Sequence, residues 1–88
     1  MKWRLLIAAL LLSTAAHAMD IYRFGSSTVS VGDSVAKLVE VAGQPIYKEP
    51  IESKQGGYAG ERWQYKQDRT TIEFTISGGK IVSITESH

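Results

Sequence analysis

The last third of the chain alternates apolar and polar residues over three successive segments, and this pattern constrains the fold most. The segments run from Glu61 to Lys66, from Thr71 to Ser77 and from Lys80 to Thr85. Alternation with a period of two is typical of strands that bury one face of an antiparallel sheet. We therefore expect a three-stranded antiparallel meander.

The register of the last hairpin depends on the turn that follows Ser77. A two-residue turn would place Phe74 opposite Ser83, whereas a three-residue turn places Phe74 opposite Val82. Burial of both apolar faces selects the second register. We therefore predict the three-residue turn, with Gly79 in its left-handed position.

Matching apolar faces also set the pairing of the first two strands. Trp63 should lie opposite Phe74, and Tyr65 opposite Ile72, across the loop of residues 67–70. Trp63 and Tyr65 could stack on a sugar or a base, but their alternation favours the core. The expected core consists of Val35, Leu38, Val39, Trp63, Tyr65, Ile72, Phe74, Val82 and Ile84.

One amphipathic helix precedes the meander. Asp33 or Ser34 can cap its start, Gly43 supplies a left-handed end, and Pro45 blocks continuation. Asp33 could instead be a catalytic acid or a metal ligand, but the adjacent apolar stripe favours a cap. The stripe consists of Val35, Leu38, Val39 and Ala42.

Residues 21–24 and 28–31 suit strands, so an N-terminal strand or hairpin should precede the helix. The expected fold class is α+β: one short helix packed on a three-stranded antiparallel meander, with that strand or hairpin at the N-terminus.

The first 18 residues have the three parts of a secretory signal peptide. Two basic residues precede the apolar run 5–12, and a small-residue segment ends at Ala18. The apolar run is shorter than the about 20 residues of a spanning helix. We therefore predict cleavage between Ala18 and Met19, which leaves residues 19–88 as one small domain in the periplasm or outside the cell, without a membrane span or lipid anchor.

Composition narrows the function classes. The chain has no cysteine, and His88 is the one histidine after residue 18, which argues against a Cys/His metal cage, a thiol nucleophile and a Ser-His-Asp triad. Without Lys2 and Arg4, the ten basic residues become eight against nine acidic ones. A near-neutral chain lacks the basic footprint of a nucleic-acid binder. We expect no catalytic residues, no cofactor and no metal.

Residues 51–60 are rich in glycine and indicate a flexible loop. They lack the Gly-Lys-Ser/Thr ending of a phosphate-binding loop. Tyr58 has no expected core role, and tyrosine is enriched at interfaces. Nearby Glu49, Glu52 and Glu61 could hold calcium, but no known loop spacing is present, so we expect a solvated acidic rim. The candidate interaction residues are Tyr58, Gly56, Gly57 and Gly60.

Several short motifs resemble a known family. They are Arg23-Phe24-Gly25, Val31-Gly32-Asp33-Ser34, Gly43-Gln44-Pro45, Trp63-x-Tyr65, Phe74 and Gly79-Lys80-Ile81-Val82-x-Ile84. From Tyr22 to Ile84 the chain resembles a family of short secreted bacterial proteins of unknown function. It is also distantly similar to the SmpA/OmlA (BamE-type) outer-membrane assembly lipoprotein domain. The resemblance implies an SmpA/OmlA-like fold and protein contacts in the envelope.

The chain departs from these relatives at three positions. The family of unknown function usually has cysteines where this chain has Phe24 and Ala42. The resemblance implies that those cysteines are partners, so we expect Phe24 to pack on Ala42. Met19 stands where the assembly lipoproteins have their lipid-attachment cysteine. A role that requires tethering to the outer membrane is therefore not expected.

The sequence thus favours a periplasmic or secreted, non-enzymatic protein that binds an envelope protein as an interaction or accessory domain. A small inhibitor-type module of a periplasmic enzyme is the alternative. A hydrolase that uses two carboxylates is a second alternative, which would need a cleft with two acids about 5–9.5 Å apart.

Overall fold

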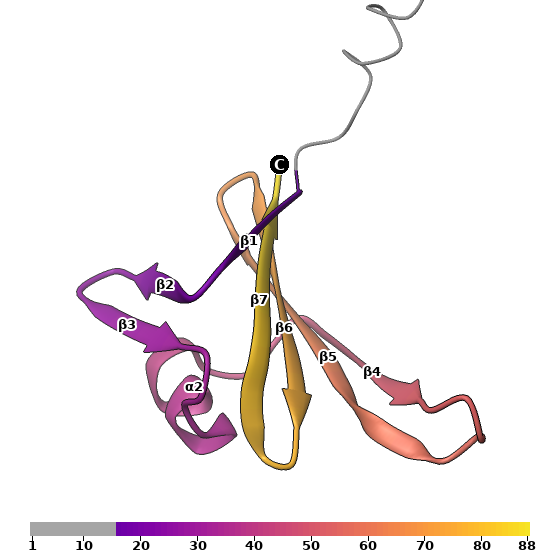
Figure 1. Cartoon of the computed structure of the whole chain (residues 1–88). Coiled ribbons are helices and arrows are strands. Elements are labelled where there is room, and N and C mark those ends of the chain that lie inside the picture. The colour runs from indigo at the N-terminus through magenta and orange to yellow at the C-terminus, as the bar shows by residue number, and fades with distance from the viewer. Residues whose placement is uncertain (1–15) are drawn as a thin grey trace, which may run out of the picture.

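The computed structural model describes residues 16–88 and shows two layers within them. Five strands form an antiparallel sheet in the order β1-β7-β6-β5-β4, and β2 and β3 form a separate hairpin (Figure 1). The strands are β1 (Ala16–Met19), β2 (Ile21–Phe24), β3 (Ser27–Ser30), β4 (Tyr47–Glu52), β5 (Tyr58–Gln67), β6 (Thr70–Ser77) and β7 (Lys80–Ser87). The helix is α2 (Val35–Ala42).

The expected fold class, a helix on a three-stranded meander, is wrong because this part of the chain is mostly β-structure and its main sheet has five strands. Two of the five lie outside the expected meander. β4 contains Pro50, but β4 is an edge strand, and an edge strand tolerates proline. β1 comes from residues that match a signal-peptide cleavage region.

The pairing of the first two meander strands is confirmed. Trp63 lies opposite Phe74, and Tyr65 lies opposite Ile72. All four side chains are buried, so burial on one face selects this register as predicted.

The prediction of a three-residue turn between β6 and β7 is wrong, because the turn has two residues. Gly78 and Gly79 have φ values of 62° and 75°, and Ser77 pairs with Lys80 across them. Positive φ at both central residues is typical of a two-residue type I′ turn, which only glycine and a few polar residues adopt easily.

A bulge in β7 then restores the burial that the turn alone would lose. The register shifts by one residue after Ile81, so that Phe74 lies opposite Ile84 rather than Ser83. The extra residue is Val82, whose side chain is 49% exposed. Ile84 therefore takes the position opposite Phe74 that was predicted for Val82, and Ile81 is buried opposite Ile76.

Helix α2 begins and ends as expected. The Ser34 hydroxyl accepts a hydrogen bond from the Lys37 backbone N–H at 3.1 Å, so Ser34 is the cap. Gly43 has φ 79° and donates its N–H to the Val39 carbonyl at 2.8 Å. Pro45 follows two residues later and prevents continuation.

The β2–β3 hairpin and α2 lie on one side of the sheet, and the core lies between these layers (Figure 1). The ring of Phe24 contacts those of Tyr65 and Phe74, with centroids 5.6 Å and 6.0 Å away. Phe24 and Ala42 both pack against the same core. The buried residues are Val29, Leu38, Trp63, Tyr65, Ile72, Phe74, Ile76, Ile81 and Ile84, while Val35 and Val39 are partly buried at its margin.

The Tyr65 hydroxyl ties the helix to the sheet. It donates a hydrogen bond to the Gly43 carbonyl at 2.7 Å, which satisfies an oxygen at the helix C-terminus. Burial raises the pKa of Tyr65 to about 12. The phenol therefore remains a hydrogen-bond donor at physiological pH.

Candidate functional site

The hairpin of β4 and β5 projects beyond the rest of the sheet. β5 pairs with β6 only from Glu61 onward, whereas residues 58–60 pair with β4 alone. Figure 1 shows this hairpin diverging from β6 and β7. We call residues 46–60 the β4–β5 arm.

The base of the arm is held where β5 passes the end of β6. Gly60 is buried with φ 144°, and a Cβ there would clash with the Ile76 carbonyl oxygen. The Ser77 hydroxyl donates a hydrogen bond to the Ala59 carbonyl at 3.2 Å. Glycine is therefore required at position 60, because the backbones of β5 and β6 approach closely there. We predicted Gly60 as an interaction residue, but the structure gives it a role in the fold.

The tip of the arm is shorter and better ordered than the expected flexible loop of residues 51–60. Only residues 53–57 connect the two strands. The Ser53 N–H donates to the Gly57 carbonyl at 2.7 Å, and the Gly56 N–H donates to the Ser53 carbonyl at 2.9 Å. The Gly57 N–H donates to the Ser53 hydroxyl at 3.1 Å, so three hydrogen bonds close the tip.

Tyr58 is the most exposed large apolar residue of residues 16–88, with 72% of its surface accessible. It begins β5 and lies opposite Glu52 on β4. Ile46 and Tyr47, at the other end of the arm, are 66% and 52% exposed. The arm therefore presents three large apolar side chains to solvent from a paired backbone.

Two glutamates, Glu52 and Glu61, lie beside Tyr58. Its pKa is raised, first by desolvation and then by the charge of Glu61 and a hydrogen bond to that carboxylate. The Glu61 carboxylate also accepts the indole N–H of Trp63 at 2.7 Å. With Glu52 directly opposite on β4, this end of the arm combines an aromatic ring with negative charge.

Trp63 itself is unavailable for stacking on a ligand. It is 6% exposed, and the Lys48 ammonium lies 4.5 Å from the centre of its ring. The aromatic pair that we weighed as a stacking surface is therefore part of the core, since Tyr65 is also only 5% exposed.

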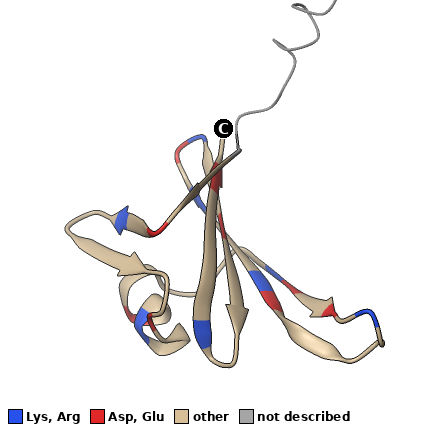
Figure 2. Ribbon diagram, viewed as in Figure 1, with Lys and Arg blue, Asp and Glu red and all other residues tan. Residues whose placement is uncertain are grey.

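The three carboxylates that we considered as a calcium site, those of Glu49, Glu52 and Glu61, do not converge. The Arg62 Nε lies 3.1 Å from the Glu49 carboxylate and 3.4 Å from that of Glu73. By strand alternation, Glu49 and Glu61 lie on opposite faces of the sheet. Within residues 16–88, no three His, Asp or Glu side chains lie close enough to hold a metal ion, and charges of both signs are spread over the strands (Figure 2).

Asp33 stabilises the local backbone, and its carboxylate contacts Ser30 and Lys37. Its carboxylate accepts the Ser30 backbone N–H at 2.8 Å and lies 3.4 Å from the Lys37 ammonium. These contacts lower its pKa, chiefly through the Ser30 hydrogen bond. Asp33 thus stays ionised and fixes the turn between β3 and α2.

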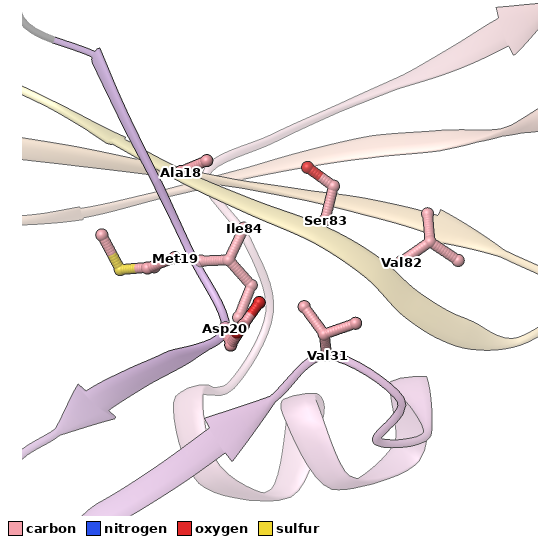
Figure 3. Close-up of a pocket in the computed structure, with 7 residues that line it drawn as sticks. All are labelled: Ala18, Met19, Asp20, Val31, Val82, Ser83 and Ile84. Carbon is pink, nitrogen blue, oxygen red and sulfur yellow. The ribbon is translucent and has the colours of Figure 1, made fainter.

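An open pocket of about 300 Å³ lies where β1 passes into β2, beside β7 (Figure 3). It includes the two residues that flank the predicted cleavage site. Sequence reasoning missed it because its walls come from segments far apart in the chain. The lining residues are Ala18, Met19, Asp20, Val31, Val82, Ser83 and Ile84.

These features define a small antiparallel β-domain with one helix, a projecting arm and an open pocket at the β1–β7 edge. No protein-family model, curated protein or solved structure significantly matches the chain. None of the helices among residues 16–88 has the length and apolarity to cross a membrane.

Proposed function

We propose that this chain is an exported, non-enzymatic protein-interaction domain of the bacterial envelope, and that its β4–β5 arm carries the binding surface. The observation that carries the proposal is the position of Tyr58, 72% exposed on two paired strands. An aromatic ring on an ordered backbone loses little conformational entropy when it binds. The signal-like first 18 residues and the motif resemblance to short secreted proteins support the export part.

The chemistry around Tyr58 specifies the partner surface. Glu52 and Glu61 place negative charge beside the ring. A complementary surface is an apolar socket that receives the phenol and is bordered by Lys or Arg side chains. The partner we propose is an envelope protein with such a socket.

The test is crosslinking in intact cells with the full chain tagged at its C-terminus. Tyr58→Ala should lower recovery of the captured envelope protein by more than about tenfold, as truncation of a central aromatic does. The matched control is Ile21→Ala, because Ile21 is 59% exposed on β2, outside the arm. The control should retain wild-type recovery.

Two outcomes would contradict the proposal. Equal recovery from Tyr58→Ala and Ile21→Ala would remove the arm from the binding surface. Recovery no greater than that of an unrelated exported protein would overturn the interaction function itself.

One observation favours the inhibitor-type alternative. Hydrogen bonds from Ser53 to Gly57 close the tip of the arm, and an inhibitory loop needs such order. In this alternative the arm inserts into the cleft of a periplasmic hydrolase. Inhibition assays against a panel of such hydrolases test it, and inhibition that Tyr58→Ala abolishes would support it over an accessory role.

A further inference from the structure

The predicted cleavage site lies inside a strand of the main sheet. β1 pairs antiparallel with β7, so that Ala18 lies opposite Thr85 and Met19 lies opposite Ile84. Cleavage between Ala18 and Met19 would remove every β1 residue except the last. The outer edge of β7 would then lose most of its partner strand.

The ladder shows which backbone groups cleavage would free. Two-residue turns at both ends of β6 close on the pairs Gln67–Thr70 and Ser77–Lys80. The backbone hydrogen-bonding groups of successive residues point alternately to the two neighbouring strands. The N–H and carbonyl of Glu73 therefore point toward β7, where Glu73 is paired with Thr85. Ile84 and Glu86 therefore turn their N–H and carbonyl groups toward β1.

The other end of this edge stays covered after cleavage. The Gly32 N–H donates to the Ile81 carbonyl at 2.8 Å, and the Ile81 N–H donates to the Asp33 carbonyl at 2.9 Å. The open part would therefore run over residues 82–87, a length of about 20 Å. Met19 would keep its pair with Ile84, beside the Asp20 carbonyl that accepts the Val31 N–H at 2.8 Å, but as the first residue of the processed chain it would be held more weakly than within a continuous β1.

The pocket lies directly beside this edge and would open with it. Ala18 is one of its lining residues and would leave with the cleaved segment. Val31 and Val82, exposed by 40% and 49%, would remain as apolar walls (Figure 3). Cleavage would thus expose unpaired backbone groups next to an apolar hollow.

We propose that in the processed chain the β7 edge binds an extended segment of a partner protein in the place of β1. The bound β1 strand defines the chemistry of that segment. It would have a small side chain at the Ala18 position, a basic or polar one opposite Glu86, as His17 is, and an apolar one packed against the core opposite Ile84, as Met19 is. Addition of a strand to a free sheet edge is a general mode of peptide recognition. The inference rests on the export part of the proposed function, and it is independent of the β4–β5 arm.

The test expresses the full chain in cells and purifies the processed protein, whose mass is measured first. The probe is a fluorescent synthetic peptide, Thr-Ala-Ala-His-Ala-Met-Asp, which repeats residues 14–20. Anisotropy should show binding to the processed chain. A cleavage-resistant Ala18→Leu chain should bind at least about tenfold more weakly, because its own β1 still covers the edge.

A pair of variants tests the backbone contact. Glu86→Pro removes the edge N–H that we place toward the bound segment, and it should weaken peptide binding at least about tenfold. Glu86→Ala keeps that N–H and should stay within about threefold of the wild type. Equal binding by both variants would overturn the proposed register.

Hydrogen exchange on the unmodified processed chain needs no variant. The amides of Ile84 and Glu86 should exchange faster than those of Thr85 and Ser87, and the peptide should protect them. Unprotected amides, or no binding to a chain that begins at Met19, would overturn this inference alone. A purified chain that retains residues 1–18 would overturn the export proposal instead.

Discussion

Replacing Gly60 with alanine tests how the arm leaves the sheet. Alanine at φ 144° is strained, and a sparsely populated backbone conformation costs about 1–3 kcal/mol. The new Cβ would also clash with the Ile76 carbonyl oxygen, which is backbone and cannot rotate away. Overpacking of this kind costs a further 1–3 kcal/mol or so.

The total, about 2–6 kcal/mol, is a large share of the stability of a small domain, which is about 5–15 kcal/mol. At about 4–8 °C per kcal/mol for a domain of this size, Gly60→Ala should lower Tm by at least about 8 °C. Thermal unfolding followed by circular dichroism measures the shift, and urea unfolding measures the free energy.

Two other glycines separate the contributions. Gly78 has φ 62° with no atom within 4 Å of an added Cβ, so Gly78→Ala tests backbone strain without a clash. An added Cβ on Gly57 would lie 3.6 Å from the Ser53 hydroxyl, an ordinary contact, so Gly57→Ala should change stability by less than about 1 kcal/mol. If Gly60→Ala unfolds within about 2 °C of the wild type, the reasoning about the close approach is refuted.

Two further predictions concern the core. Tyr65 has a pKa of about 12 in the folded chain, against about 10 when unfolded; the free energy of unfolding should therefore keep the full Tyr65 contribution below pH 10 and lose it as pH rises toward 12. Urea unfolding over that range checks this, and an equally steep decline in Tyr65→Phe would contradict it. The Phe24→Cys, Ala42→Cys double variant tests the expected contact between Phe24 and Ala42, which both pack against the core; it should oxidise to a disulfide, and a thiol assay that still finds two free thiols after oxidation would refute that contact.

The meander and the helix were predictable because each rests on a local pattern. Alternation placed Trp63 opposite Phe74, and Ser34 and Gly43 supplied the helix ends. The register between β6 and β7 was not predictable, because alternation of apolar residues cannot distinguish a three-residue turn from a two-residue turn followed by a bulge. Both bring apolar faces together, but only the bulge exposes Val82 and buries Ile81.

The two edge strands were not predicted as members of the main sheet, for different physical reasons. Pro50 weakens a strand in a sheet centre but not at an edge, and edge position depends on the whole topology. Residues 16–19 are small or polar except Met19, and their strand depends on pairing with β7, some 65 residues away.

Tyr58 was identifiable because a large aromatic in a glycine-rich segment lacks an expected core position. The position of Tyr58 on two paired strands was not predictable, because the hydrogen bonds between Ser53 and Gly57 that close the tip depend on backbone geometry. The pocket was equally hidden, since Val31 and Val82 meet only after folding.

The most direct measurement of the interaction function is site-specific photo-crosslinking in intact cells. A photoreactive phenylalanine analogue replaces Tyr58 in one variant and Lys66 in another; Lys66 is exposed on the same strand but outside the arm. The proposed function predicts a discrete adduct with an envelope protein from position 58 and none from position 66. No adduct from position 58, or the same adduct from both positions, would contradict it.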